Sequence, residues 1–220
     1  MAMLSIAIRN NTSNANRTYN ILAEPPTVRG GADPAALPVT WHRTTAGAKA
    51  EFAFTDDLYA FVGQASRATL APGTTIMLET ARRLETWNTK FNNGDELAVT
   101  SDRQLQPRGR AARRGTFTLS MDSSLQRQSR LVVGLAREAE GAIEGPAPVA
   151  VVPLLPGDVY VFAPSLAVWV VGGGEQDDLV VQEAPAARAR NAALVQFPRA
   201  ASRAVVTEYS GPRFQPVEYS

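Results

Sequence analysis

The chain has 220 residues, with 22 basic and 21 acidic side chains, one histidine and no cysteine. A formal charge of +1 excludes a global field that would recruit nucleic acid or an anionic membrane. The absence of cysteine excludes disulfides, thiolate nucleophiles and cysteine-bound zinc, and a single histidine excludes a metal site built from several histidines.

The first apolar stretch, residues 3–9, is interrupted by Ser5 and ends at Arg9. It lacks the basic lead-in and the longer apolar core of a secretory signal, so it predicts a first strand. On this basis the sequence predicts a cytoplasmic or unconventionally exported protein.

Turn-forming residues recur at short intervals along the chain, and the segments between them are rich in Val, Thr, Phe, Tyr and Trp. This pattern is typical of many short strands rather than helices. Segments 49–54 and 117–121 alternate apolar and polar residues, as antiparallel strands with one buried face do. The sequence predicts strands near residues 3–9, 17–23, 38–43, 49–54, 58–63, 73–79, 85–91, 95–100, 115–121, 130–135, 148–154, 158–162, 166–171, 178–182, 192–197 and 203–209.

The clearest turn signal is the dipeptide at residues 93–94, Asn-Gly, which accepts positive φ at both central positions. It predicts a tight hairpin between strands 87–91 and 96–99. Residues 103–114, in contrast, are predicted to form a long loop.

The stretch from Gly145 to Gly174 is nearly uncharged, with Asp158 as its one charged residue. Five prolines divide it into pieces far shorter than the ~20 residues of a membrane-spanning helix. The sequence therefore predicts no transmembrane segment. It predicts three strands rich in β-branched residues instead, at 149–152, 159–162 and 167–171.

The predicted strands show no internal repeat and no hinge-like linker between them. Many short strands with few helical segments are typical of two antiparallel sheets packed face to face. We therefore predict one all-β domain over residues 1–220, a single-domain antiparallel β-sandwich of two sheets with little helix.

Two groups of turn-and-strand motifs resemble those of a known protein family. The first is Asn-Asn-Thr-Ser at residues 10–13, followed by Tyr-Asn-Ile-Leu-Ala-Glu-Pro-Pro at residues 19–26. The second is Val-Pro at 152–153 and Pro-Gly-Asp-Val-Tyr at 156–160, leading to Trp-Val at 169–170. Together they span most of the chain, which resembles a poorly characterised family of small, β-rich, mostly fungal proteins. The resemblance implies a β fold and, because the family has no assigned activity, no catalytic residue.

The chain lacks the motifs of common catalytic and cofactor sites. No Gly-x-Ser-x-Gly motif presents a serine to the single histidine, His42. The glycines 172–174 lack the Gly-Lys-Ser/Thr ending of a phosphate loop, and no segment has the ligand spacing of a calcium loop. We therefore predict that the protein is not an enzyme and holds neither a cofactor nor a metal.

The Arg-rich loop predicted near residues 103–114 contains five arginines and no acidic residue. The patch has three interpretations: a solvated loop, a contact with acidic residues of another subunit, or a site for an anionic ligand. Because the run contains no aromatic side chain for stacking, nucleic acid is not expected to bind there. The candidate interface or anion contacts are Arg103, Arg108, Arg110, Arg113 and Arg114.

Three tryptophans are well separated in the sequence. Trp169 lies in an apolar strand and is predicted to be in the core. For Trp41 and Trp87 two roles remain open, core packing and stacking on a ligand such as a sugar ring.

Without catalytic motifs, the protein is predicted to act through its surface. The first hypothesis is a structural or self-assembling β-sandwich, a homo-oligomer or polymer, because the strands within 148–171 would pair strongly with another copy if their edges were exposed. The alternative is a lectin-like or lipid-surface-binding module that recognises a glycan or an anionic ligand through the Trp-bearing turns and the arginines.

Overall fold

The computed structural model describes nine stretches of the chain. Over these stretches the protein forms strands β1 to β19 and no α-helix, which confirms the predicted all-β fold class. No helix in this part of the chain is long and apolar enough to cross a bilayer. The described residues are 3–30, 34–85, 93–125, 130–139, 145–173, 178–183, 191–198, 200–210 and 213–220.

The strands form four sheets, which we call A to D, rather than the two that were predicted. Sheet A contains β18 (Arg213–Phe214), β17 (Arg203–Tyr209), β1 (Met3–Asn11) and β6 (Lys49–Thr55), with β19 (Glu218–Tyr219) also paired to β17. Sheet B contains β16 (Ala192–Val195), β15 (Val168–Gly172), β2 (Arg17–Ala23) and β5 (Thr40–Ala46). Sheet C contains β10 (Leu105–Arg113), β9 (Asn93–Val99), β11 (Phe117–Met121), β14 (Val159–Ala163) and β3 (Thr27–Arg29). Sheet D contains β4 (Leu37–Pro38), β13 (Ala147–Pro153), β12 (Leu131–Arg137), β7 (Tyr59–Ala65) and β8 (Ile76–Arg83).

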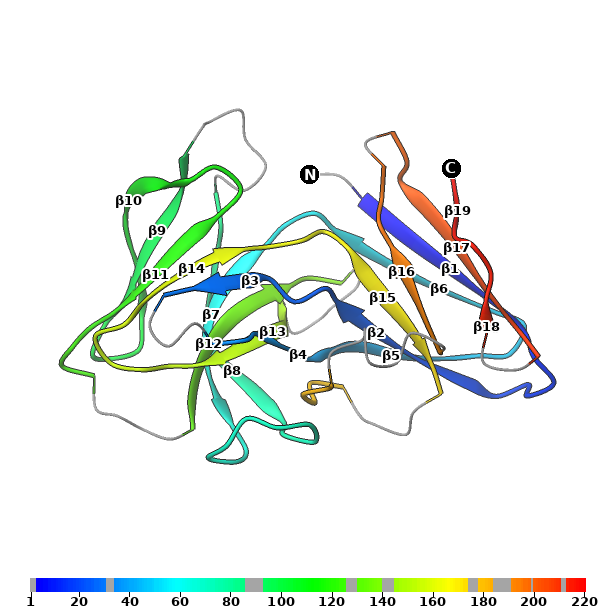
Figure 1. The fold of residues 1–220 in the computed structure, drawn as a ribbon, viewed down its shortest axis with the longest axis horizontal. Helices are drawn as coiled ribbons and strands as arrows, with labels where there is room; N and C mark the ends of the chain where they lie inside the picture. Colours follow the sequence, from blue (N-terminus) through cyan, green and yellow to red (C-terminus); the bar gives the residue numbers. More distant parts are fainter. Residues whose placement is uncertain are drawn as a thin grey trace.

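The sheets are arranged in two lobes of an elongated molecule, with sheets C and D on the left and sheets A and B on the right (Figure 1). The chain passes repeatedly between them, for example from β2 into β3 and from β14 into β15. One hydrophobic cluster draws on all four sheets through buried residues such as Ile6, Ile21, Leu119 and Val133. Neither lobe is therefore a continuous piece of chain with a core of its own.

Most strand pairs are antiparallel, as predicted, but two are parallel. β1 pairs with β17, and β9 pairs with β11, in the parallel sense. An apolar–polar alternation has the same period of two in both kinds of pair, so the sequence pattern does not distinguish them.

The predicted alternations are confirmed by the burial of side chains. In β6, Phe52 and Phe54 are buried, whereas Lys49 and Glu51 are exposed. In β11 every second residue is buried, beginning at Phe117.

The prediction of a loop at residues 103–114 is wrong, because β10 occupies most of it. β10 is an edge strand that pairs with β9, and its register shifts on either side of Gly109. Most of its side chains are exposed, so the apolar–polar alternation that marks a half-buried strand is missing from the sequence. Irregular register and arginines also discourage pairing of this edge with another chain.

The prediction of a tight turn at Asn93 and Gly94 is also wrong. Both residues lie in β9, opposite Arg113 and Ala112 of β10. A Cβ atom on Gly94 would overlap the carbonyl oxygen of Thr116, so the close approach of two backbones requires glycine here. The other strand of the predicted hairpin, 87–91, lies outside the described residues.

The three β-branched strands that motivated the self-assembly hypothesis all lie inside sheets. β13 lies between β4 and β12, β14 between β11 and β3, and β15 between β16 and β2. None of the three is an edge strand, so they offer little free backbone to a second copy.

A buried ion pair joins sheet A to sheet B. Glu208 on β17 is fully buried and accepts two hydrogen bonds from the guanidinium of Arg17 on β2, at 2.7 and 3.1 Å. The hydrogen bond from Arg17 to Glu208 raises the pKa of the arginine. A Cβ atom on Gly172 would come within 2.8 Å of the carboxylate, so this glycine leaves room for the pair.

Removing the buried carboxylate is expected to destabilise the protein strongly. Glu208→Gln should lower the free energy of unfolding by about 3 kcal/mol, since Arg17 then loses its counter-charge. The matched control is Glu85→Gln, which breaks an exposed ion pair with Arg110 and should cost less than about 1 kcal/mol. Urea unfolding measures both, and equal losses would contradict a special role for the buried pair.

Candidate functional site

A groove of about 670 Å³, which we call the aromatic groove, opens between β5, β6 and the segments that end β12 and begin β13. It combines apolar walls with three polar side chains that can donate or accept hydrogen bonds, which is the usual make-up of a small-molecule site. Its lining consists of Met3, Ser5, Trp41, His42, Glu51, Phe52, Ala53, Ala139, Gly145 and Ala147.

β5 brings both Trp41 and His42 to this groove, although neighbouring residues of a regular strand point to opposite faces. In the register of β2 with β5, Ile21 lies opposite His42. The next residue, Leu22, lies opposite Thr40, so Trp41 has no partner in β2. This is a β-bulge, which leaves one residue out of the ladder and redirects its side chain. The bulge therefore explains why adjacent side chains line one groove.

The ring of Trp41 is part of the core as well as of the groove. It is 4% exposed and packs edge-on against Phe52 and Phe54, with ring centroids 4.9 and 5.0 Å away. The half-buried ring of His42 stacks on Phe52 at 5.0 Å. Of the two roles that the sequence left open for Trp41, core packing is thus the larger, and the ring contributes an edge to the floor of the groove.

The polar side chains of the groove are Ser5, His42 and Glu51. The Glu51 carboxylate is half-exposed and lies 4.0 Å from the Lys49 ammonium and 3.9 Å from the guanidinium of Arg203. These separations are longer than a charge-assisted hydrogen bond, so the carboxylate oxygens retain capacity to accept further donors.

The same polar side chains are not assembled as a catalytic triad. Within the described residues no hydrogen bond joins His42 to Ser5 or to Glu51. A serine nucleophile is activated by a base within hydrogen-bond reach, and neither His42 nor Glu51 forms such a bond with Ser5 in the described structure. In the described part of the chain, no group of three or more His, Asp or Glu side chains is placed to hold a metal ion.

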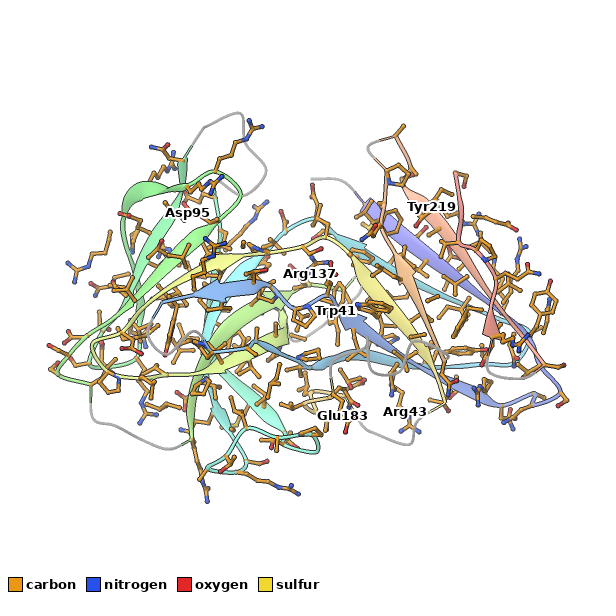
Figure 2. The ribbon with its side chains drawn as sticks, in the orientation of Figure 1. Trp41, Arg43, Asp95, Arg137, Glu183 and Tyr219 are labelled. Carbon is orange, nitrogen blue, oxygen red and sulfur yellow. The ribbon has the colours of Figure 1, made fainter. Side chains whose placement is uncertain are left out.

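Behind Trp41 lies a fully buried cation, Arg137 of β12 (Figure 2). Its guanidinium carbon is 5.7 Å from the centroid of Trp41 and 6.0 Å from that of Phe54, and one nitrogen donates to the carbonyl oxygen of Ser165. Nε and the other terminal nitrogen have no hydrogen-bond partner among the described residues. Desolvation lowers the pKa of Arg137 to about 10, which reflects how poorly this position suits a charge.

The arginines of residues 103–114 fall into two groups. Arg103 lies 3.3 Å from Glu79, and Arg110 lies 2.7 Å from Glu85, so part of the predicted patch is neutralised by acidic residues of the same chain on or beside β8. The remaining three are exposed. They are Arg108, Arg113 and Arg114.

Arg108 lies near an acidic side chain as well. The pKa of Asp122 is lowered mainly by hydrogen bonds from Ser124, and the charge of Arg108 contributes to the shift. Arg113 and Arg114 lie at the end of β10, away from these acidic residues, and line a second groove that is described below.

The sequence did not identify Ser5, Glu51, Phe52 or Arg137 as site residues. The alternation of β6 contains Glu51 and Phe52, but it indicates only which residues face the core. Their meeting with Trp41 depends on the bulge, which the sequence pattern does not reveal. Trp87, the other candidate for stacking, lies outside the described residues.

Comparison of the chain with protein-family models, with curated proteins and with solved structures finds no match. The resemblance to small, β-rich fungal proteins therefore stays a prediction. The case for function depends on the geometry of the molecule itself.

The buried guanidinium of Arg137 leads to a prediction about stability. Arg137→Met should raise the free energy of unfolding by about 1–2 kcal/mol, because it removes a desolvated charge with two unpaired nitrogens and keeps an unbranched apolar side chain. Arg17→Met is the control, and it should destabilise because it leaves Glu208 buried and unpaired. Equal destabilisation by both substitutions, measured by urea unfolding, would contradict this account of Arg137.

Proposed function

We propose that the protein is a non-catalytic, lectin-like module that binds a neutral saccharide in the aromatic groove. The observation that carries the proposal is the bulge of β5, which brings Trp41 and His42 together beside Phe52. A saccharide ring has apolar C–H faces and a rim of hydroxyls, so it suits a groove that has an apolar floor and polar groups around it.

The polar groups fit hydroxyls better than they fit a single charge. The Ser5 hydroxyl both donates and accepts, the ring nitrogens of His42 form hydrogen bonds, and the Glu51 carboxylate accepts from hydroxyl donors. Donors and acceptors on one surface match the hydroxyl, which is itself both. Hydrogen bonds to a carboxylate are stronger than those to neutral groups, so Glu51 contributes most to orienting the saccharide.

This proposal takes up the alternative reached from the sequence rather than the first hypothesis of subunit contacts. That hypothesis drew its support from strands within 148–171, and these strands lie inside the sheets. Self-association stays a prediction, without a free edge in this region to support it.

The test is a printed array of neutral mono- and oligosaccharides, followed by calorimetric titration of the saccharide that binds most strongly. His42→Ala and Glu51→Gln should each weaken binding about tenfold or more, since one lost hydrogen bond to a ligand hydroxyl corresponds to that factor. Neither substitution removes a fully buried side chain, so the melting temperature should change little.

The matched control is Thr45→Ala, an exposed residue of the same strand as His42 that does not line the groove. Its affinity should equal that of the unmodified protein. Three outcomes would contradict the proposal: a blank array, equal affinities for all variants, or hydrolysis of the bound saccharide.

A further inference from the structure

A second groove, of about 370 Å³, gathers three arginines on sheet C, and we call it the arginine groove. Arg29 comes from β3, whereas Arg113 and Arg114 come from the end of β10 and the turn that follows. Thr27, Thr116 and Val161 also line it. It shares no lining residue with the aromatic groove.

The backbone holds Arg29 on the wall of this groove. β3 pairs with β14 so that Arg29 lies opposite Val161, and Thr27 lies opposite Ala163. Directly opposed residues of an antiparallel pair project from the same face of a sheet. All four line the groove, so one face of the β3–β14 pair forms one wall.

A tight turn holds the other two arginines. The carbonyl oxygen of Arg113 accepts hydrogen bonds from the backbone N–H of Thr116, at 2.9 Å, and from its hydroxyl, at 2.5 Å. Gly115 has a φ of +72°, which other residues rarely adopt, so glycine permits the turn. The turn keeps Arg113 and Arg114 at the end of β10, where the groove opens.

Among the described residues, no acidic side chain balances the charges in this groove. Arg29, Arg113 and Arg114 form no ion pair with any residue in the described ranges, and no acidic side chain is part of the described lining. Arg103 and Arg110, by contrast, are each paired to a glutamate. Like charges repel unless a counter-charge is bound, so the arginine groove is suited to an anion from outside the chain.

We propose that the arginine groove binds the sulfate or phosphate esters of an acidic saccharide chain. The planar fork of arginine matches a tetrahedral oxyanion with two parallel hydrogen bonds, and three forks in one concavity suit several such groups. Among the described residues, no aromatic side chain lines the groove to stack on bases, which disfavours nucleic acid. Its concave form also differs from the exposed apolar surface by which a protein enters a bilayer.

The test is calorimetric titration with a heparin-derived octasaccharide, a phosphorylated oligosaccharide and the desulfated octasaccharide. One or both of the first two should bind with an affinity that falls steeply as salt is added, and the desulfated chain should show none of this steeply salt-dependent binding. Which of the two binds identifies the ester. Vesicles containing phosphatidylserine and an oligo-dT strand serve as the other arms, and preferential binding of either would overturn the assignment.

Single substitutions distinguish binding in the arginine groove from non-specific attraction to the positive charge of the protein. Arg29→Gln, Arg113→Gln and Arg114→Gln should each weaken binding of the acidic chain about tenfold. The matched control is Arg110→Gln, which removes the same charge from the same strand at a paired position and should change the affinity less than twofold. Equal effects of all four substitutions would show non-specific attraction and overturn the proposal.

Thermal unfolding tests whether these arginines stabilise the fold rather than bind the acidic chain. Because the three arginines repel one another, Arg113→Gln should leave the melting temperature unchanged or raise it. A clear fall in melting temperature together with lost binding would mean that the arginine serves the fold, which contradicts the proposal. This inference does not depend on the aromatic groove: His42→Ala should bind the acidic chain as tightly as the unmodified protein does.

Discussion

The contact between Trp41 and Arg137 links three of the four sheets, and the candidate site is built around it. Trp41 belongs to sheet B, its ring meets Phe52 and Phe54 of sheet A, and Arg137 reaches it from sheet D. No described residue supplies a counter-ion to Arg137. A buried cation in this position is costly, and the aromatic rings and one carbonyl offset only part of that cost. The bulge in β5 makes the contact possible, because it frees Trp41 from the regular ladder.

The same bulge connects the fold to its proposed function. Without it, Trp41 and His42 would project from opposite faces, and the groove beside β6 would lose one of them. The arginine groove arises separately, from a turn at Gly115 and the pairing of β3 with β14. Two surfaces of different chemistry thus lie on one framework: one has aromatic rings and a carboxylate, and the other is cationic.

The sequence predicted much of the β framework but little of either site. The strands at 17–23 and 203–209 have the predicted bounds, because alternation and turn residues are local signals. β10 was missed, since an exposed edge strand lacks an apolar face. The bulge at Trp41 was missed because one extra residue does not change the composition of a strand. Arg29 was missed because its place in the arginine groove depends on pairing with Val161, which is far away in the sequence.

The central claim is that a neutral saccharide occupies the aromatic groove, and the single histidine offers the most direct test. The ring signals of His42 in a proton–carbon NMR spectrum need no assignment by mutation, because no other imidazole is present. Titration with a saccharide that binds should shift these signals in proportion to occupancy. Unchanged His42 signals at saturation would place the ligand elsewhere and contradict the account.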